Sequence, residues 1–198
     1  MRPAAIGYHL VETPLGVVGI AWSERGLTRL QLPGRDAVET ERLLTMPRSG
    51  FHNPECRSDA RVILEALLPP AMAGLAASLK RYAAGDVVDF DEVPVHLRGV
   101  GEFRRAIYGE ARAIRFGDVT TYGELAERAG HAGAARETGQ AMGSNPCPLV
   151  IPCHRVLAAG RKPGGFSAPG GVSTKTRLLA LEGVRIGPDA AAQTRFAF

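Results

Sequence analysis

The spacing of hydrophobic residues changes character near the middle of the chain. Before position 33 it alternates with a period close to two, as in strands, over the runs 7–11, 17–22 and 27–32. Beyond position 100 it follows the period of an amphipathic helix, most clearly over 102–114. Strands followed by helices are typical of an α+β fold built from two parts. We therefore predict a β-rich first part that ends close to the Gly-Val-Gly at 99–101.

Within the first part, we also expect helices at 35–44, 61–68 and 73–84, and a further strand at 87–97. Pro69 and Pro70 are predicted to interrupt the second helix, because proline has no backbone N–H to donate. The resulting division of the chain is 1–97 for the first domain, 98–187 for the second and 188–198 for a C-terminal tail.

The composition excludes several classes of protein. The 198 residues are 45% hydrophobic and 22% charged, which is typical of a folded globular protein rather than a disordered one. No apolar run approaches the ~18 residues of a membrane-spanning helix. Glu12 interrupts the N-terminal stretch early, so we expect no secretion signal. Three cysteines are too few for a disulfide framework, and we expect a reducing, cytoplasmic compartment.

The charge is unevenly distributed along the chain. Residues 1–95 hold 10 Lys and Arg against 12 Asp and Glu, whereas residues 96–187 hold 13 against 7. A basic second half indicates an anionic partner, with nucleic acid as the first candidate. An uneven surface without a partner would give the same count, so the charge alone leaves both interpretations open.

The second half contains the outline of a helix-turn-helix. A helix at 121–128, which Thr120 or Thr121 can cap, is followed by a Gly-containing turn at 130–133 and a further helix at 134–142. The last helix is unusually small in its side chains, with Ala134, Ala135, Gly139 and Gly143. Small residues let either a DNA duplex or a neighbouring helix approach closely, and the sequence does not decide between the two.

The segment 144–156, Ser-Asn-Pro-Cys-Pro-Leu-Val-Ile-Pro-Cys-His-Arg-Val, carries the most chemistry. Residues 149–151 are expected to form a buried, strand-like run, and Pro152 is followed at once by Cys153 and His154. Nearby positive charge favours the reactive thiolate of a cysteine. On an extended chain adjacent side chains point to opposite sides, so His154 would reach the sulfur through a water or a local turn. A small buried cysteine without chemistry is the alternative.

Read together, these segments resemble the O6-alkylguanine-DNA alkyltransferase family. The resemblance rests on Pro-Cys-His-Arg-Val at 152–156, Gly-Gly-Phe-Ser at 164–167 and Leu-Leu-Ala-Leu-Glu-Gly at 178–183. It extends back to Phe-Gly-Asp-Val-Thr-Thr-Tyr-Gly-Glu-Leu-Ala at 116–126 and to Ala-Ala-Arg at 134–136. The resemblance covers about 90 residues strongly and most of the chain loosely. The implied fold is a small α/β N-terminal domain with a ribonuclease-H-like sheet, packed on a mainly helical C-terminal domain with a helix-turn-helix.

The resemblance also implies a function. A member of this family binds duplex DNA through the minor groove, flips out an O6-alkylguanine and transfers the alkyl group irreversibly to its own cysteine. Cys153 matches the acceptor position. His154 would deprotonate it through a water, and Glu182 would fix the tautomer of His154. Tyr122 would donate its hydroxyl to a ring nitrogen of the leaving guanine.

The same resemblance assigns residues to DNA and to the base pocket. Arg136 would fill the space of the flipped base, on a helix whose small residues Ala134, Ala135 and Gly139 face the DNA. Asn145 would bond local backbone in the turn before the active-site segment. The remaining pocket and structural residues are Arg155, Val156, Phe166 and Ser167.

Departures from the family pattern touch packing more than chemistry. Phe166 stands where many members have tyrosine, and Cys147 where an aliphatic residue is usual. Some members bind zinc in the N-terminal domain, but His52 and Cys56 are a lone pair, so we expect no metal. The implied protein is a monomer without a cofactor.

Two other classes of function compete with alkyl transfer. A lesion-binding protein of the alkyltransferase-like type would lack the acceptor cysteine, which is present here as Cys153. A Cys-His hydrolase would use Cys153, His154 and Glu182, but it would need an oxyanion-hole signature that the sequence lacks.

Overall fold

The computed structural model describes residues 7–46, 61–97 and 99–186 of the chain. Its first part is a four-stranded sheet in the order β3-β2-β1-β4. The strands are β1 (Gly7–Thr13), β2 (Gly16–Ser23), β3 (Gly26–Gln31) and the short β4 (Arg61–Val62). The first three form an antiparallel meander, and β4 pairs parallel to β1.

The two hairpin turns depend on glycine. Gly16 and Gly26 both have a positive φ, of 115° and 130°. A Cβ at Gly26 would also lie only 2.4 Å from the carbonyl oxygen of Pro94, so this position excludes any side chain. The close approach lets the backbone of Leu27 bond to that of Pro94 and His96, which ties the 87–97 segment to the edge of the sheet.

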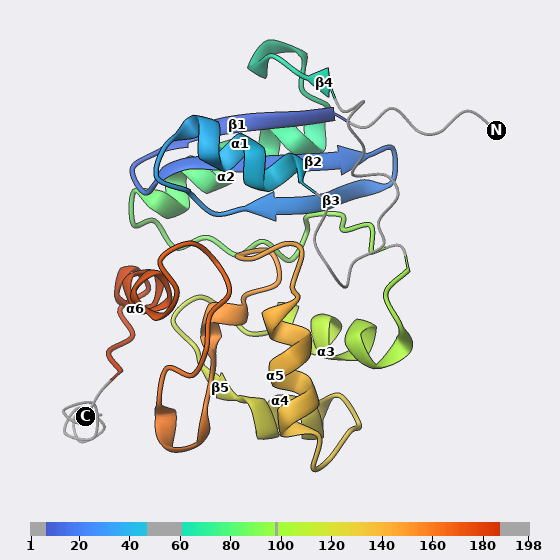
Figure 1. The fold of residues 1–198 in the computed structure, drawn as a ribbon, viewed down its shortest axis with the longest axis vertical. Coiled ribbons are helices and arrows are strands. Elements are labelled where there is room, and N and C mark those ends of the chain that lie inside the picture. Colours follow the sequence, from blue (N-terminus) through green and yellow to red (C-terminus); the bar gives the residue numbers. More distant parts are fainter. Residues whose placement is uncertain (1–6, 47–60, 98, 187–198) are drawn as a thin grey trace.

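One helix covers each face of the sheet (Figure 1). Helix α1 (Ala37–Thr45) is capped by Asp36, whose side chain accepts from the backbone of Glu39, and it packs Leu44 against Tyr8 and Ala21. Helix α2 (Pro70–Ala83) lies on the opposite face and buries Met72, Leu75, Leu79 and Tyr82. The alternation of the strands supplies both faces with apolar side chains.

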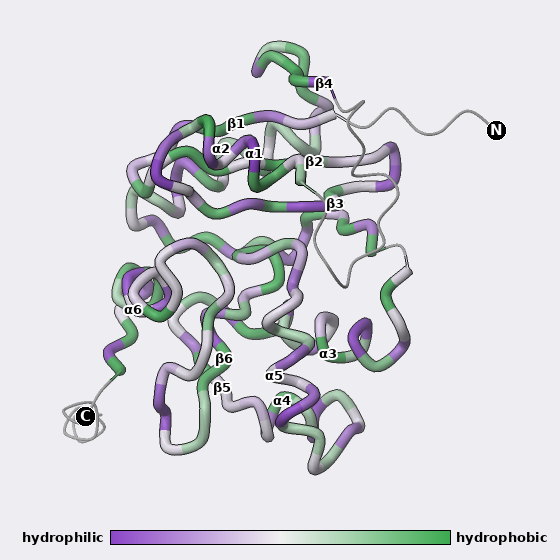
Figure 2. Tube along the Cα trace, viewed as in Figure 1, coloured by the Kyte–Doolittle hydropathy of each residue, from purple (hydrophilic) through white to green (hydrophobic). Residues whose placement is uncertain are grey.

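The second part is mainly helical. Its helices are α3 (Glu102–Arg112), α4 (Tyr122–Arg128), α5 (Ala135–Gly143) and α6 (Val172–Leu181). A two-stranded parallel pair, β5 (Thr120–Thr121) with β6 (Val156–Leu157), joins the start of α4 to the chain that follows Cys153. Hydrophobic and hydrophilic residues alternate along elements of both parts (Figure 2), and one buried apolar cluster runs from the sheet into the helices.

The predictions of helices at 35–44, 73–84, 102–114, 121–128 and 134–142 were right to within a few residues. The capping box at Thr121 explains the sharp start of α4, because its hydroxyl accepts from Glu124 N while the Glu124 carboxylate accepts from Thr121 N. None of the helices among the described residues is both long and apolar enough to span a membrane.

The helix predicted at 61–68 was wrong. Residues Arg61–Val62 form β4 and Glu65–Leu67 a single 3-10 turn (η1). Leu64 and Leu67 are 69% and 71% exposed. The apolar residues of this segment have helical spacing, but they do not pack against the rest of the protein as one buried helix face. Pro70 does not interrupt a helix but begins α2, at a position where no backbone N–H is needed.

Two predicted strands were also wrong. Residues 87–97 form only an isolated bridge between Val95 and Leu27, and Arg112 of α3 takes up the backbone carbonyls of Asp91 and Val93. Residues 149–151 are buried but form a turn, with Leu149 at a φ of 71°. The Ile151 carbonyl accepts from the side chain of Asn145 and not from a neighbouring strand. The boundaries 97/98 and 187/188 of the three predicted segments remain predictions, and 188–198 lies outside the described residues.

Candidate active site

Cys153 begins a single 3-10 turn, Cys153–Arg155 (η2), and not an extended segment as the sequence suggested. Asn145 organises the chain that leads to it: its Oδ1 accepts from the backbone N–H of Cys147 at 2.9 Å, and its Nδ2 donates to the carbonyl of Ile151 at 2.7 Å. The side chain thereby bridges both ends of the turn before Cys153. This is the local backbone bonding that the resemblance implies for Asn145.

A cavity of about 450 Å³ opens onto Cys153, which is 7% exposed. The helical part contributes Asn145, Pro148, Phe166 and Ser167 to its wall, and the sheet part contributes Leu30 and Met46 among others. The volume lies within the range of small-ligand pockets. Cys153 is therefore buried between both parts of the chain, at the wall of a cavity.

Next to Cys153, three titratable side chains form a buried cluster. The Nε2 of His154 lies 2.8 Å from Oε1 of Glu182. Arg155 donates to both carboxylate oxygens of Glu182, from Nε at 2.9 Å and from Nη2 at 3.0 Å. At most 3% of each of these side chains is exposed. Arg155 thus holds the carboxylate and does not line the Cys153 cavity.

The protonation of this cluster follows from its environment. Burial alone would raise the pKa of Glu182, but the hydrogen bonds and charges of His154 and Arg155 outweigh it and lower the pKa to about 2. Burial lowers the pKa of His154. Glu182 is therefore ionised and His154 neutral near pH 7, with the imidazole proton on Nε2, where the carboxylate accepts it. The Nδ1 of His154 is left with a lone pair, and it is buried without a hydrogen-bond partner among the described residues.

The acid stability of the fold should depend on Glu182. A carboxyl whose pKa falls from about 4.5 to about 2 on folding stabilises the native state above pH ~4.5, and this contribution is lost as the pH falls towards 2. Between pH 5 and pH 3 we expect Glu182 to account for a loss of roughly 2 kcal/mol in the free energy of unfolding. Urea unfolding at both pH values should show a smaller loss in E182Q than in the parent protein. Equal losses in the two proteins would contradict the assignment.

Tyr122 lies at the first position of α4, where β5 and β6 bring it towards the active-site segment. Its hydroxyl is 3.5 Å from the carbonyl oxygen of Gly165. Burial raises its pKa, so the phenol keeps its proton. Neither Tyr122 nor Val156 lines the cavity at Cys153. A Cβ at Gly164 would lie 3.2 Å from the Tyr122 ring, so this glycine lets the loop backbone approach the tyrosine.

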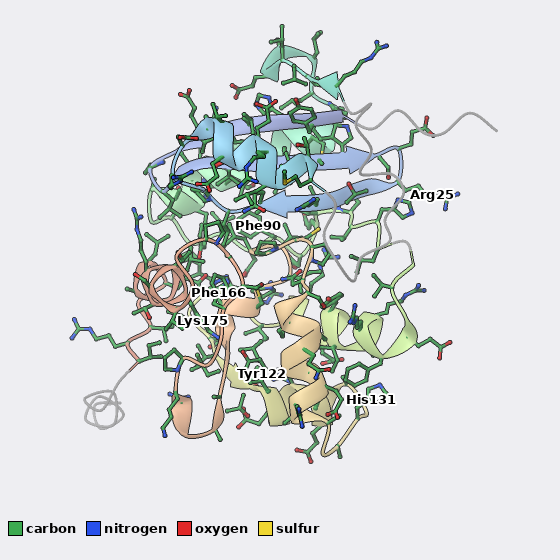
Figure 3. The ribbon with its side chains drawn as sticks, viewed as in Figure 1. Arg25, Phe90, Tyr122, His131, Phe166 and Lys175 are labelled. Carbon is green, nitrogen blue, oxygen red and sulfur yellow. The ribbon has the colours of Figure 1, made fainter. Side chains whose placement is uncertain are left out.

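A further charged residue, Lys175, received no role from the sequence. It belongs to α6 and is fully buried, with its Nζ 2.5 Å from the carbonyl oxygen of Val156 and 5.7 Å from the centroid of the Tyr122 ring. Burial lowers its pKa to about 8. Figure 3 shows Lys175, Phe166 and Tyr122 together in the helical part. A lysine within an otherwise apolar helix face is the signal that could have identified it.

Helix α5 presents its small residues to open space. Ala135 and Arg136 are exposed, whereas Thr138, Ala141 and Met142 face the core. A Cβ added at Gly139 or Gly143 would meet nothing within 4 Å. Close packing against a neighbouring helix therefore does not explain these glycines, which leaves the approach of an external partner as the remaining interpretation.

No group of three or more His, Cys, Asp or Glu side chains in the described ranges could hold a metal ion. His52 and Cys56 lie outside the described residues, so the expected absence of a metal remains a prediction.

Comparisons with known proteins agree with the fold. Residues 102–184 match the family model of the DNA-binding domain of 6-O-methylguanine DNA methyltransferase. A methylated-DNA–protein-cysteine methyltransferase of Mycolicibacterium paratuberculosis is 34% identical over 177 residues, which cover 89% of this chain and 92% of the relative. Its counterpart in Mycobacterium tuberculosis is 39% identical over 184 residues, covering 93% and 96%.

Among solved structures, M. tuberculosis OGT in complex with DNA aligns with a TM-score of 0.67 and 30% identity, over 92% of this chain and 96% of that one. These observations define a class of α+β protein. Its helical part matches a DNA-binding domain, and its cysteine is enclosed at a cavity. The chain belongs to the methylated-DNA–protein-cysteine methyltransferase family of DNA repair proteins. The predicted family and fold class are thus confirmed.

Proposed function

We propose that this protein binds double-stranded DNA containing O6-alkylguanine, flips the damaged base out of the helix through the minor groove and transfers the alkyl group to Cys153 in a single turnover. The observation that carries the proposal is the buried Nδ1 of His154, which has no partner among the described residues, next to a cysteine that opens onto a cavity. Because Glu182 accepts a hydrogen bond from Nε2–H, the lone pair of the ring lies on Nδ1. Nδ1 can therefore act as a base and accept a proton.

The transfer is a displacement at a saturated carbon. The Cys153 thiol gives its proton to His154 Nδ1 through one water, and Glu182 stabilises the imidazolium that forms. The thiolate then attacks the alkyl carbon, so that a sulfur–carbon bond forms while the carbon–oxygen bond breaks. The electron pair of the broken bond goes to guanine, and the Tyr122 hydroxyl hydrogen-bonds a ring nitrogen of the leaving base. The product is a thioether, which no group in the site can hydrolyse, and the protein is consumed.

DNA binding is assigned to helix α5. Its open, small-residue face around Ala134, Ala135 and Gly139 suits a close approach to the minor groove, and the exposed Arg136 would occupy the gap left by the flipped base. Phe166 and Ser167, which line the cavity at Cys153, would contact the base. We further propose that the protein acts as a monomer in the cytoplasm. It would need no metal or cofactor, because a thiolate alone supplies the chemistry.

Intact-mass analysis tests the proposed reaction. After incubation with an excess of duplex DNA containing one O6-methylguanine, the protein should gain a single methyl group, and peptide mapping should place it on Cys153. Matched duplex with unmodified guanine is the control and should leave the mass unchanged. Methyl uptake on Cys147 or Cys56, or release of methylguanine without protein modification, would reject the mechanism.

A further inference from the structure

One side chain from the sheet part of the chain reaches into the His154–Glu182 pair. Tyr82, on the last turn of α2, is fully buried and donates its hydroxyl to Oε1 of Glu182 at 2.7 Å. This is the same oxygen that accepts from His154 Nε2 at 2.8 Å. Tyr82 and Glu182 are 100 residues apart, so only the packing of α2 against the helical part brings them together.

The position of the Tyr82 ring is constrained on two sides. Phe90 lies edge-on to it, with the ring centroids 5.6 Å apart, and Phe116 does so at 6.1 Å. Such edge-to-face contacts leave a buried ring little freedom. Burial and the negative charge of Glu182 raise the pKa of Tyr82 far above its usual value, so the phenol remains a hydrogen-bond donor throughout the stable pH range of the protein.

We propose that Tyr82 is a positioning residue for alkyl transfer, which holds Oε1 of Glu182 in line with His154 Nε2. The sheet part of the chain thus completes the catalytic site of the helical part. Arg155 also donates to both oxygens of the carboxylate, with Nη2 on the same Oε1, and the backbone N–H of Gly117 reaches Oε2 at 3.3 Å. The inference rests on the proposed role of His154 as the base.

Loss of the Tyr82 hydroxyl should also change the pH dependence of the reaction. The groups that act on His154 are Glu182, which is hydrogen-bonded to it, the charges of Arg155 and of Lys175 on α6, and Tyr82 of α2 through the carboxylate. Asp89 acts on Arg155 from 3.6 Å. With one donor fewer, the charge of Glu182 stabilises the imidazolium more strongly and raises the pKa of His154. His154 then becomes protonated, and inactive as a base, at a higher pH.

The variant Tyr82→Phe tests this proposal, because it removes the hydroxyl and keeps the ring contacts. We expect the rate constant for Cys153 alkylation by free O6-benzylguanine to fall about tenfold at neutral pH, because Oε1 of Glu182 is no longer held in line with Nε2 of His154. The acid limb of the pH–rate profile should move to higher pH. Tyr108→Phe is the matched control: this hydroxyl is equally buried but donates to the backbone carbonyl of Ala141, at 2.8 Å.

The outcomes separate a positioning role from simple packing. A parental rate and profile in Y82F would overturn the proposal, as would an equal slowing in Y108F. If Y82F unfolds at the assay temperature, 3-fluorotyrosine in place of Tyr82 decides instead, because the more acidic phenol is a stronger donor and should move the acid limb to lower pH. An unmoved acid limb in that protein would overturn the proposal.

Failure of the proposed function would be visible separately. If the parental protein takes up no alkyl group, the proposed role of His154 in alkyl transfer is rejected. NMR titration of ¹⁵N-labelled histidine then tests the geometry in unreacted protein. The pKa of His154 should be higher in Y82F than in the parental protein and Y108F, and an unchanged value would overturn the role of Tyr82.

Discussion

Replacing Glu182 with glutamine (E182Q) is expected to lower the free energy of unfolding by about 3 kcal/mol or more and to slow alkyl transfer at least about 100-fold. The stability effect follows from Arg155, whose guanidinium is buried and bonded to both oxygens of Glu182. A neutral amide leaves that cation without its nearest compensating charge. Asp89, at 3.6 Å from Arg155, is more exposed and replaces it only in part.

The rate effect of E182Q has a separate cause. The amide can turn its NH₂ group towards either Arg155 or His154, and each orientation loses a hydrogen bond that the carboxylate makes. Without the negative charge of the carboxylate beside Nε2, the imidazolium formed during proton transfer is no longer stabilised, and the Nε2–H tautomer is no longer enforced. The Cys153 thiolate should therefore form more rarely.

Urea unfolding and alkylation by free O6-benzylguanine measure the two effects. The control variant is Glu65→Gln, which removes an even shorter ion pair, 2.6 Å to Lys80, at the protein surface. It is expected to leave both stability and rate nearly unchanged, because exposed ion pairs contribute little. If E182Q is as stable and as active as E65Q, the buried cluster has neither of the roles assigned to it.

Replacing Arg136 with alanine (R136A) is expected to slow repair of duplex DNA about 100-fold while leaving alkylation by free O6-benzylguanine near the parental rate. Arg136 is exposed at the start of α5, and its side chain makes no hydrogen bond or ion pair within the described part of the chain. A side chain that occupies the space of a flipped base offsets a few kcal/mol of unstacking. Free base needs no flipping and so does not need this residue.

Single-turnover rates on the two substrates test the role of Arg136. Arg25, an exposed arginine in the sheet part of the molecule (Figure 3), provides the control, and R25A should match the parental protein on both substrates. Equal losses on duplex and free base in R136A would reject a role in flipping and would indicate damage to the cavity at Cys153.

Local chemistry explains why much of the helical part could be predicted. Thr121 and Glu124 lie three residues apart and form a capping box, and the 102–112 segment has one continuous apolar side. Segments without such signals were predicted wrongly. Residues 61–68 have helical spacing, yet Leu64 and Leu67 meet no partner to bury them. Residues 87–97 have the composition of a strand, but the Arg112 side chain, and not a neighbouring strand, donates to the carbonyls of Asp91 and Val93.

The amino-acid order alone settled which groups are available for chemistry: a cysteine next to a histidine, a distant glutamate, and a helix with an unusually bare face. The folded chain decided how they act. It placed Cys153 in a 3-10 turn beside a cavity, buried Lys175 against Val156, and brought Tyr82 onto the carboxylate that orients His154. The physical reason is the sequence separation of the interacting residues. Helix caps and periodic apolar faces involve residues within one or two helical turns of each other, so local sequence predicts them. A hydrogen bond across 100 residues depends on how α2 packs against the helices and has no counterpart in local sequence.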